Sequence, residues 1–351
     1  MFVFALTQVT ARLADDLSWG GLLRGLLVLS AIWWAWAAYA WLTNEVDGRR
    51  RGVRLAICGA MIAMLLASLA VPGAFEDDAL LFALSYLGVR VMHIALFAAG
   101  SEHGDVRGAV RALAPTALFA PALLILASGL DGTAQVACWI VALLLDYLGA
   151  ALRGIERWRL SPGHFAERHG LIVIIALGES IVAIGVGAEG IDLGTGELLA
   201  AALGVIVSAA LWWVYFDAAL EGVEERLHAL TGRARNTTAR DAFSFLHLPL
   251  VAGIVLLALG VKKTLEHVDD PLKAVAAVAL CAGVALYLAA DVAFRRRCLG
   301  RAEPGRLVAA AACLAVIPLA LELPALAALA IVAAICATLV ASESLRSVVS
   351  P

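Results

Sequence analysis

Residues 164–187 read HFAERHGLIVIIALGESIVAIGVG, and this stretch decides the class of fold. After a polar start, the chain stays apolar for nearly as long as a membrane-spanning helix requires, which is about 20 residues. Similar apolar stretches recur along all 351 residues, of which 62% are hydrophobic and 16% charged. Soluble domains contain about 45–50% apolar and about 25% charged residues. We therefore expect an all-α, polytopic membrane protein rather than a soluble domain.

Twelve hydrophobic segments are predicted, near residues 1–14, 22–42, 53–71, 79–99, 109–128, 133–152, 166–188, 197–219, 241–260, 271–293, 305–321 and 324–342. Arginine-rich loops alternate with acidic loops, and basic loops favour the cytoplasmic side of a membrane. The charged residues in question are Arg49, Arg50, Arg51, Arg54, Glu76, Asp77, Asp78, Arg107, Arg111, Asp131, Arg153, Arg157, Arg159, Glu189, Asp192, Glu197, Arg226, Arg233, Arg235, Arg240, Arg295, Arg296, Arg297, Arg301 and Arg306. This alternation predicts that both termini are cytoplasmic, and the mixed loop at residues 262–273 fits it least well.

A faint internal repeat divides the chain into two halves. FVFALTQV at residues 2–9 resembles VIIALGES at residues 173–180. An N-terminal half at residues 1–160 and a C-terminal half at residues 161–351 then contain six segments each, in the same orientation. Such parallel halves commonly pack around a pseudo-twofold axis normal to the membrane, with a binding site between them.

Glu179 interrupts the most apolar part of the opening stretch. If the helix enters from the cytoplasm near Arg168, Glu179 lies eleven residues deeper, or about 16 Å at 1.5 Å per residue. A charge at that depth costs roughly 2.5–3.5 kcal/mol on insertion scales. Eleven residues complete about three turns, so His164, Arg168 and Glu179 form one polar stripe, with Glu167 beside its cytoplasmic end. We expect a functional acid, and a neutral, hydrogen-bonded structural glutamate is the alternative.

Arg90 and His93 also fall inside an apolar segment, one helical turn apart. An arginine at mid-membrane needs an anionic partner, because an unpaired buried charge is strongly destabilising. Glu179 is the preferred candidate for this partner, and Asp146 is the alternative. Purely structural pairing is an equally good explanation for the arginine.

Further polar and aromatic residues have two interpretations each. His247 precedes Pro249 and is either a ligand-binding residue or a core histidine with satisfied hydrogen bonds. Trp33 and Trp36 lie deeper than the membrane interface, where tryptophan is usually found. They either line a cavity for an apolar, aromatic or cationic ligand or simply pack between helices. Asp291 falls near a helix end, where a solvated position would explain it.

The sequence contains little that would bind a metal ion or a cofactor. His164 and His169 are five residues apart, which turns a helix by about 140°, whereas helical zinc ligands use an i, i+4 pair. We find no glycine-rich phosphate loop, bis-histidine haem pattern or hydrolase motif. We therefore expect no metal, no cofactor and no nucleic-acid partner.

Three stretches in order resemble the signature of the bacterial low temperature requirement A family: FVFALTQVT (2–10), WWAWAAYAWLTNEVD (33–47) and HFAERHGLIVIIALGESIVAIG (164–185). The resemblance covers essentially the whole chain. It implies a multi-pass protein of the bacterial inner membrane that is linked to growth in the cold, and it implies no particular biochemical activity. The family usually has an acidic, Phe-rich stretch before FVFAL, so we expect either a first helix that is truncated relative to the family or a wrongly assigned start.

The preferred function class is a proton-linked secondary transporter with a polar cavity between the two halves. In this hypothesis Glu179 exchanges protons, and Arg90 is its counter-charge. The cytoplasmic gate consists of His164, Glu167 and Arg168.

The alternative is an intramembrane enzyme acting on a lipid or isoprenoid, with Glu179 or Asp146 as general acid. A structural or sensory protein without turnover is a third class. The expected partners are membrane lipids and an unidentified small-molecule or lipid ligand, and a homodimer stays open as the oligomeric state.

Overall fold

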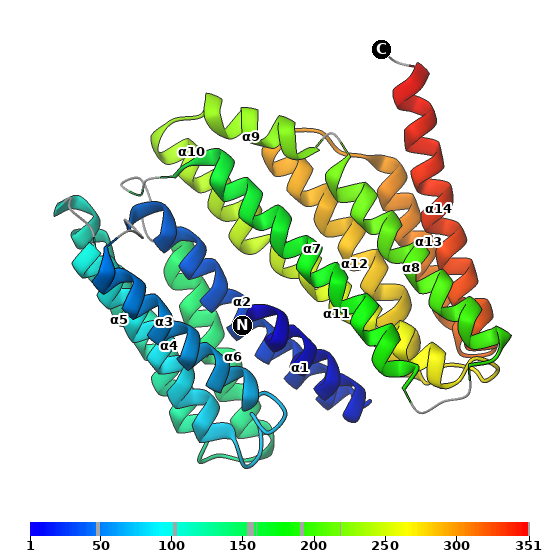
Figure 1. Cartoon of the computed structure of the whole chain (residues 1–351), viewed down its shortest axis with the longest axis horizontal. Coiled ribbons are helices and arrows are strands. Elements are labelled where there is room, and N and C mark those ends of the chain that lie inside the picture. Colours follow the sequence, from blue (N-terminus) through cyan, green and yellow to red (C-terminus); the bar gives the residue numbers. More distant parts are fainter. Residues whose placement is uncertain are drawn as a thin grey trace. The chain divides into compact units, whose positions relative to one another are not determined.

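The computed structural model shows a protein built from helices (Figure 1). It describes residues 1–46, 50–100, 104–152, 158, 160–189, 193–217 and 219–349. Within these residues there are fourteen α-helices and one π-helical segment, and no strand is formed. The prediction of an all-α fold is confirmed.

Each of the twelve predicted segments overlaps one helix of the structure. These helices are α1 (Phe2–Asp15), α2 (Trp19–Glu45), α3 (Arg51–Leu69), α4 (Ala79–Gly100), α5 (Gly104–Ala127), α6 (Gly132–Leu152), α7 (Pro162–Gly187), α8 (Thr195–Phe216), α11 (His247–Glu266), α12 (Ala274–Leu299), α13 (Pro304–Ala320) and α14 (Ala325–Val349). Three more elements follow α8: α9 (Ala219–Ala229), α10 (Gly232–Ala239) and the π-helix η1 (Arg240–Phe245). Hydropathy did not predict α9 and α10 because both are short and charged or polar residues interrupt their apolar residues.

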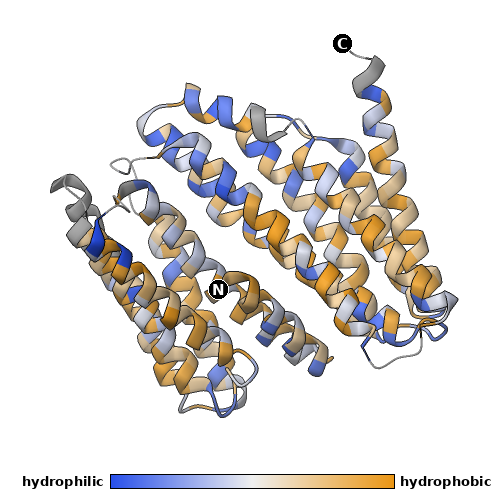
Figure 2. Cartoon of the chain, in the orientation of Figure 1, coloured by the Kyte–Doolittle hydropathy of each residue, from blue (hydrophilic) through white to orange (hydrophobic). Residues whose placement is uncertain are grey.

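Nine helices among the described residues are long and apolar enough to span a membrane. The apolar stretches Ala117–Ala127 and Pro304–Ala320 are shorter, and α1 has only 14 residues. Figure 2 shows apolar residues along the middle of most helices and hydrophilic residues mainly near their ends. The chain is therefore a multi-pass membrane protein.

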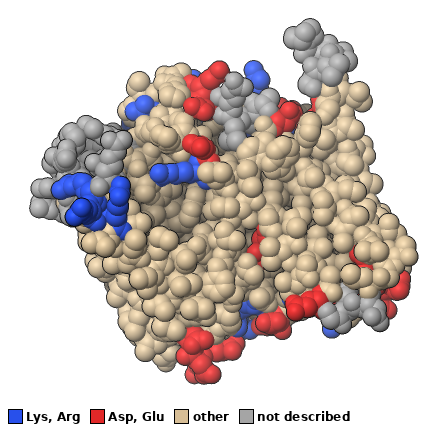
Figure 3. All heavy atoms as spheres, viewed as in Figure 1, with Lys and Arg blue, Asp and Glu red and all other residues tan. Residues whose placement is uncertain are grey.

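The orientation of the spans in the membrane stays a prediction. On the face shown in Figure 3, most charged side chains gather near the ends of helices, as the alternation of loops requires. Some charges used for that prediction lie outside the described residues: Arg49, Arg153, Arg157, Arg159 and Asp192, and the side chains of Arg107 and Arg111.

Helix packing divides the chain into two compact units. Unit 1 consists of Met1–Arg12, Gly20–Phe165 and His228–Arg240, and unit 2 consists of Leu13–Trp19, Ala166–Leu227 and Asp241–Pro351. The segment 228–240, which contains α10, belongs to unit 1 although it follows α8 in the chain. No pattern in the sequence indicates that this segment belongs to unit 1.

In unit 1, α3 packs on α4, α4 on α5 and α5 on α6. α2 joins α6 through Tyr147, whose hydroxyl donates to the Ser30 carbonyl at 2.9 Å and whose ring stacks on Trp34 at 4.2 Å. The guanidinium of Arg240 donates to the Ala151 carbonyl at 2.8 Å. This bond satisfies one of the last carbonyl groups of α6, which have no partner within the helix.

In unit 2, α11 packs on α12, α12 on α13, α13 on α14, and α14 on α8. Three glycines, Gly253, Gly260 and Gly283, let the backbones of α11 and α12 touch. A Cβ atom on Gly260 would lie 2.6 Å from Cα of Leu280, and one on Gly253 would lie 2.6 Å from the Gly283 carbonyl oxygen. Small residues allow this close approach between helices in a membrane. We call this contact the glycine seam.

A Gly260→Ala substitution is expected to lower the free energy of unfolding by about 1–3 kcal/mol, because the added methyl group overlaps backbone that cannot move aside. Reversible unfolding in mixed micelles with increasing SDS measures this loss. The matched control is Gly185→Ala in α7, where an added Cβ meets nothing within 4 Å. The free energy of unfolding of the control should rise by up to about 1 kcal/mol, because alanine has a better helix propensity than glycine. Equal changes in the free energy of unfolding at the two sites would contradict the prediction.

The order of neighbouring helices is the same in the two units. The row α3, α4, α5, α6 in unit 1 has its counterpart in the row α11, α12, α13, α14 in unit 2. α8 packs on α14 in unit 2, and in unit 1 α2 touches α6 through Tyr147. This correspondence is what an internal repeat of six helices requires, and the pseudo-twofold axis itself stays a prediction.

Candidate functional site

The predicted polar stripe on α7 changes from exposed to buried along the helix. His164 and Glu167 are exposed, and Arg168 is partly buried. Glu179 has 2% of its surface exposed, and its neighbour Ser180 is fully buried. α7 therefore carries a carboxyl group deep inside a 26-residue apolar span.

Arg90 pairs with Asp146, the alternative partner, and not with the preferred candidate Glu179. Its Nη2 lies 2.7 Å from the Asp146 carboxylate, and the two side chains are 4% and 3% exposed. Its Nε donates weakly to the Ala117 carbonyl at 3.5 Å. The pair thus connects α4 with α5 and α6 in the interior of unit 1. Breaking such a pair is strongly destabilising, because one charge is then left buried alone.

His93 joins α4 to α2. Its Nε2 lies 3.0 Å from the Ala38 carbonyl oxygen, which can only accept a hydrogen bond, so this nitrogen carries the hydrogen. The ring also contacts Tyr39 at 5.5 Å and Phe97 at 5.0 Å. His93 is 8% exposed and lies one turn from Arg90, as the sequence indicated.

His247 has the environment of a core histidine with satisfied hydrogen bonds. Nδ1 lies 2.9 Å from the Ala242 carbonyl of the π-helix η1, and Nε2 lies 2.8 Å from the hydroxyl of Tyr215. Because the carbonyl only accepts, a neutral His247 carries its hydrogen on Nδ1 and accepts from Tyr215. His169, which we had considered only as a metal ligand, is fully buried, and its ring centre lies 5.2 Å from that of His247.

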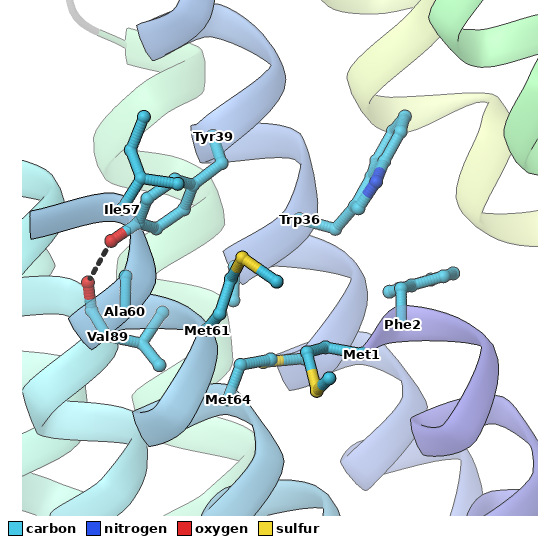
Figure 4. Close-up of a pocket in the computed structure, with 10 residues that line it drawn as sticks. Met1, Phe2, Trp36, Tyr39, Ile57, Ala60, Met61, Met64 and Val89 are labelled. Carbon is cyan, nitrogen blue, oxygen red and sulfur yellow. Dashed lines mark hydrogen bonds between the residues drawn. The ribbon is translucent and has the colours of Figure 1, made fainter. Parts of the chain in front are cut away.

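Trp33 and Trp36 have different environments although they lie in the same cluster. Trp33 is fully buried, and its ring centre is 5.1 Å from that of Trp36 and 6.3 Å from that of Phe2. Trp36 lines a cavity of about 170 Å³ together with residues of α1, α3 and α4 (Figure 4). The lining residues are Met1, Phe2, Ala35, Trp36, Tyr39, Ile57, Ala60, Met61, Met64 and Val89.

This cavity presents an almost wholly apolar surface. Its one side-chain hydroxyl, that of Tyr39, donates to the Val89 carbonyl at 3.1 Å, the bond drawn dashed in Figure 4. The sulfur-containing side chains of Met61 and Met64 and the rings of Phe2 and Trp36 make up much of the wall. A flexible apolar group suits this lining better than a polar solute.

The sequence analysis missed a buried charge cluster in unit 2, formed by Asp291, Arg295, Arg306 and Glu343. Asp291, for which a solvated position was the expectation, is fully buried. It pairs with Arg295 at 3.0 Å and also with Arg306. Arg306 in turn forms a two-pronged pair with Glu343, at 2.8 Å and 2.7 Å. The i, i+4 spacing of Asp291 and Arg295 was the local signal for this cluster.

The same cluster caps the C-terminal end of α8. Nη1 of Arg306 donates to the Val214 carbonyl at 3.0 Å, and Arg295 also donates to that carbonyl. Cationic side chains at a helix C-terminus satisfy the last carbonyl groups and favour the negative end of the helix dipole. The cluster therefore fastens α8, α12, α13 and α14 together. Within the described part of the chain, no group of three or more His, Cys, Asp or Glu side chains could hold a metal ion.

A family model described as "Bacterial low temperature requirement A protein (LtrA)" matches residues 1–341. The chain belongs to this family. The chain is also similar to "Uncharacterized protein RA0937" of Rhizobium meliloti (strain 1021), with 30% identity over 278 residues that cover 76% of this chain and 68% of that protein. No solved structure matches. The resemblance seen in the three sequence motifs is confirmed.

The predicted site residues fall into both units. Unit 1 contains Trp33, Trp36, Arg90, His93, Asp146 and His164, and unit 2 contains Glu167, Arg168, Glu179 and His247. Within unit 1, Arg90 and Asp146 are in direct contact. Within unit 2, Nε2 of His247 lies 2.8 Å from the hydroxyl of Tyr215. The roles given to these ten residues in binding or catalysis stay predictions.

Proposed function

We propose that this LtrA family member is a proton-linked secondary transporter of the bacterial inner membrane, with Glu179 as the group that exchanges protons. The supporting observation is the burial of that carboxyl group, 2% exposed, in a span with a mean hydropathy of 2.2. Carboxyl groups inside spans are costly, and they commonly belong to pathways for substrates or protons.

The remaining residues of the α7 stripe fit an entry to such a pathway. His164 and Glu167 are exposed, and Arg168 is partly buried. These three residues offer charges of both signs at the polar end of the helix, where a solute arriving from water would first meet the protein. We assign them to the cytoplasmic gate of the transporter.

The test is proton movement in proteoliposomes that contain the purified protein and a trapped pH-sensitive dye. Amino acids, sugars, organic acids, organic cations and inorganic cations are added one class at a time, with and without an imposed pH gradient. We expect one class to drive proton movement in wild-type vesicles and this movement to be lost with Glu179→Gln. Glu189→Gln is the matched control, because Glu189 is exposed just beyond the end of α7.

Two outcomes would contradict the proposal. One is a Glu179→Gln protein that transports the same solute with the same dependence on the pH gradient. The other is a wild-type protein that moves no protons with any class of solute while remaining folded in the vesicles.

One observation favours the second candidate, an intramembrane enzyme with a lipid or isoprenoid substrate. The apolar cavity beside Trp36 has room for a short apolar group (Figure 4). Asp146 is less suited to act as its general acid, because its carboxyl group is already held by Arg90 at 2.7 Å. A lipid species that disappears in a deletion strain and returns with the wild-type gene, but not with a Glu179→Gln gene, would favour the enzyme over the transporter.

A further inference from the structure

One face of α4 carries a row of polar side chains inside unit 1. Tyr86, Arg90 and His93 follow one another at spacings of four and three residues, which places them on one side of the helix. They are 1%, 3% and 8% exposed, so the row points into the protein and not towards lipid.

Two polar atoms in this row form no hydrogen bond with any residue that the structure describes. They are the hydroxyl oxygen of Tyr86 and Nδ1 of His93. Nε2 of His93 faces the Ala38 carbonyl and carries the hydrogen, so Nδ1 is an acceptor. The tyrosine hydroxyl can both donate and accept. Buried polar groups are otherwise almost always hydrogen-bonded, so each of these two needs an explanation.

Tyr86 lies one helical turn from Arg90, which pairs with Asp146 of α6 at 2.7 Å. Tyr147, the next residue after Asp146, donates to the Ser30 carbonyl of α2 and stacks on Trp34 of α2. The row on α4 therefore faces a polar surface built by α2 and α6. Donors and acceptors from three helices meet around one ion pair.

We propose that this surface is a hydrated site, in which bound water molecules connect the Tyr86 hydroxyl with the Arg90–Asp146 pair and reach Nδ1 of His93. A buried water molecule typically makes about three hydrogen bonds to groups that would otherwise lack partners. Because the ion pair has no net charge, the site favours a neutral ligand that both donates and accepts over a free ion. The inference does not involve Glu179 and goes beyond the transport role proposed above.

Hydroxyl radicals generated from water by a short X-ray pulse test this proposal, because buried side chains are oxidised only where water is bound beside them. The wild-type protein is exposed in lipid nanodiscs, and oxidation of each tyrosine is measured by mass spectrometry. Tyr287 is the internal control: it is fully buried, and its hydroxyl donates to the Leu211 carbonyl at 2.9 Å. We expect Tyr86 to be oxidised several-fold faster than Tyr287.

Equal, low oxidation of Tyr86 and Tyr287 would overturn the proposal, and this comparison needs no variant to fold. A second comparison uses the Arg90→Met/Asp146→Leu double variant, which removes both charges together. Oxidation of Tyr86 should then fall to the level of Tyr287, and unchanged oxidation would show that the ion pair does not hold the water. Neither experiment measures transport. The hydrated site can therefore be confirmed or overturned independently of the proposed role of Glu179.

Discussion

An Asp291→Asn protein is expected to lose about 3–5 kcal/mol of its free energy of unfolding, because a buried charge cluster loses its central anion. The Asp291 carboxylate is fully buried and pairs with Arg295 at 3.0 Å and with Arg306. Asparagine keeps the shape of the side chain and removes its charge. Arg295 then loses its carboxylate partner, and Arg306 keeps Glu343 as its carboxylate partner. Reversible unfolding in mixed micelles with increasing SDS measures the loss.

Asp241→Asn is the control for this prediction. Asp241 pairs with Arg297 at 3.0 Å in the same unit, but the side chains of Arg297 and Asp241 are 35% and 28% exposed. An exposed pair contributes about 0–1 kcal/mol, because water solvates both charges when the pair is broken. Similar losses for Asp291→Asn and Asp241→Asn would show that burial of the cluster does not determine its contribution.

Replacing Arg90 with methionine is expected to cost a similar amount, about 3–5 kcal/mol, since Asp146 would be left as a charge with 3% of its side chain exposed. Asp146→Leu should cost about as much by isolating Arg90. The double variant Arg90→Met/Asp146→Leu contains neither charge, and apolar replacements of a buried pair are often neutral or stabilising. A double-mutant cycle, again read by SDS unfolding, should therefore give a loss in the double variant far below the sum of the two single losses.

Additive losses in that cycle would contradict the direct pairing of Arg90 with Asp146. Thr43→Ala is a useful control within unit 1, because its hydroxyl bonds only to carbonyls of its own helix, Tyr39 at 2.9 Å and Ala40 at 3.2 Å. It should unfold within about 1 kcal/mol of the wild type, the usual net contribution of one such bond.

Most of the fold could be predicted because the signal for each span is local. A run of about 20 apolar residues is sufficient to indicate a membrane helix, and each of the twelve predicted segments, including the shorter ones, corresponds to a helix. α9 and α10 were missed for the same reason, since neither is apolar. The placement of α10 in unit 1 depends on contacts between distant parts of the chain, such as the bond from Asn236 to the Trp158 carbonyl at 2.7 Å.

The candidate site was less predictable, because the partner of a buried charge depends on which helices pack together. Depth made both Glu179 and Asp146 candidates for Arg90, with Glu179 preferred, and the structure pairs Arg90 with Asp146. A position near a helix end suggested a solvated Asp291, whereas Asp291 is fully buried. The hydrogen bond from Tyr215 to His247 joins residues 32 positions apart, and no local pattern indicates it.

The glycine seam has a consequence for motion. Helices whose backbones interlock, as α11 and α12 do at Gly253, Gly260 and Gly283, cannot slide past each other without first separating. During any conformational cycle, α11 and α12 should therefore move together as one rigid body. The charge cluster at Asp291 attaches α8, α13 and α14 to that body. α7, which contains Glu179, takes part in neither the glycine seam nor the charge cluster, so it can tilt against that body without breaking either of them.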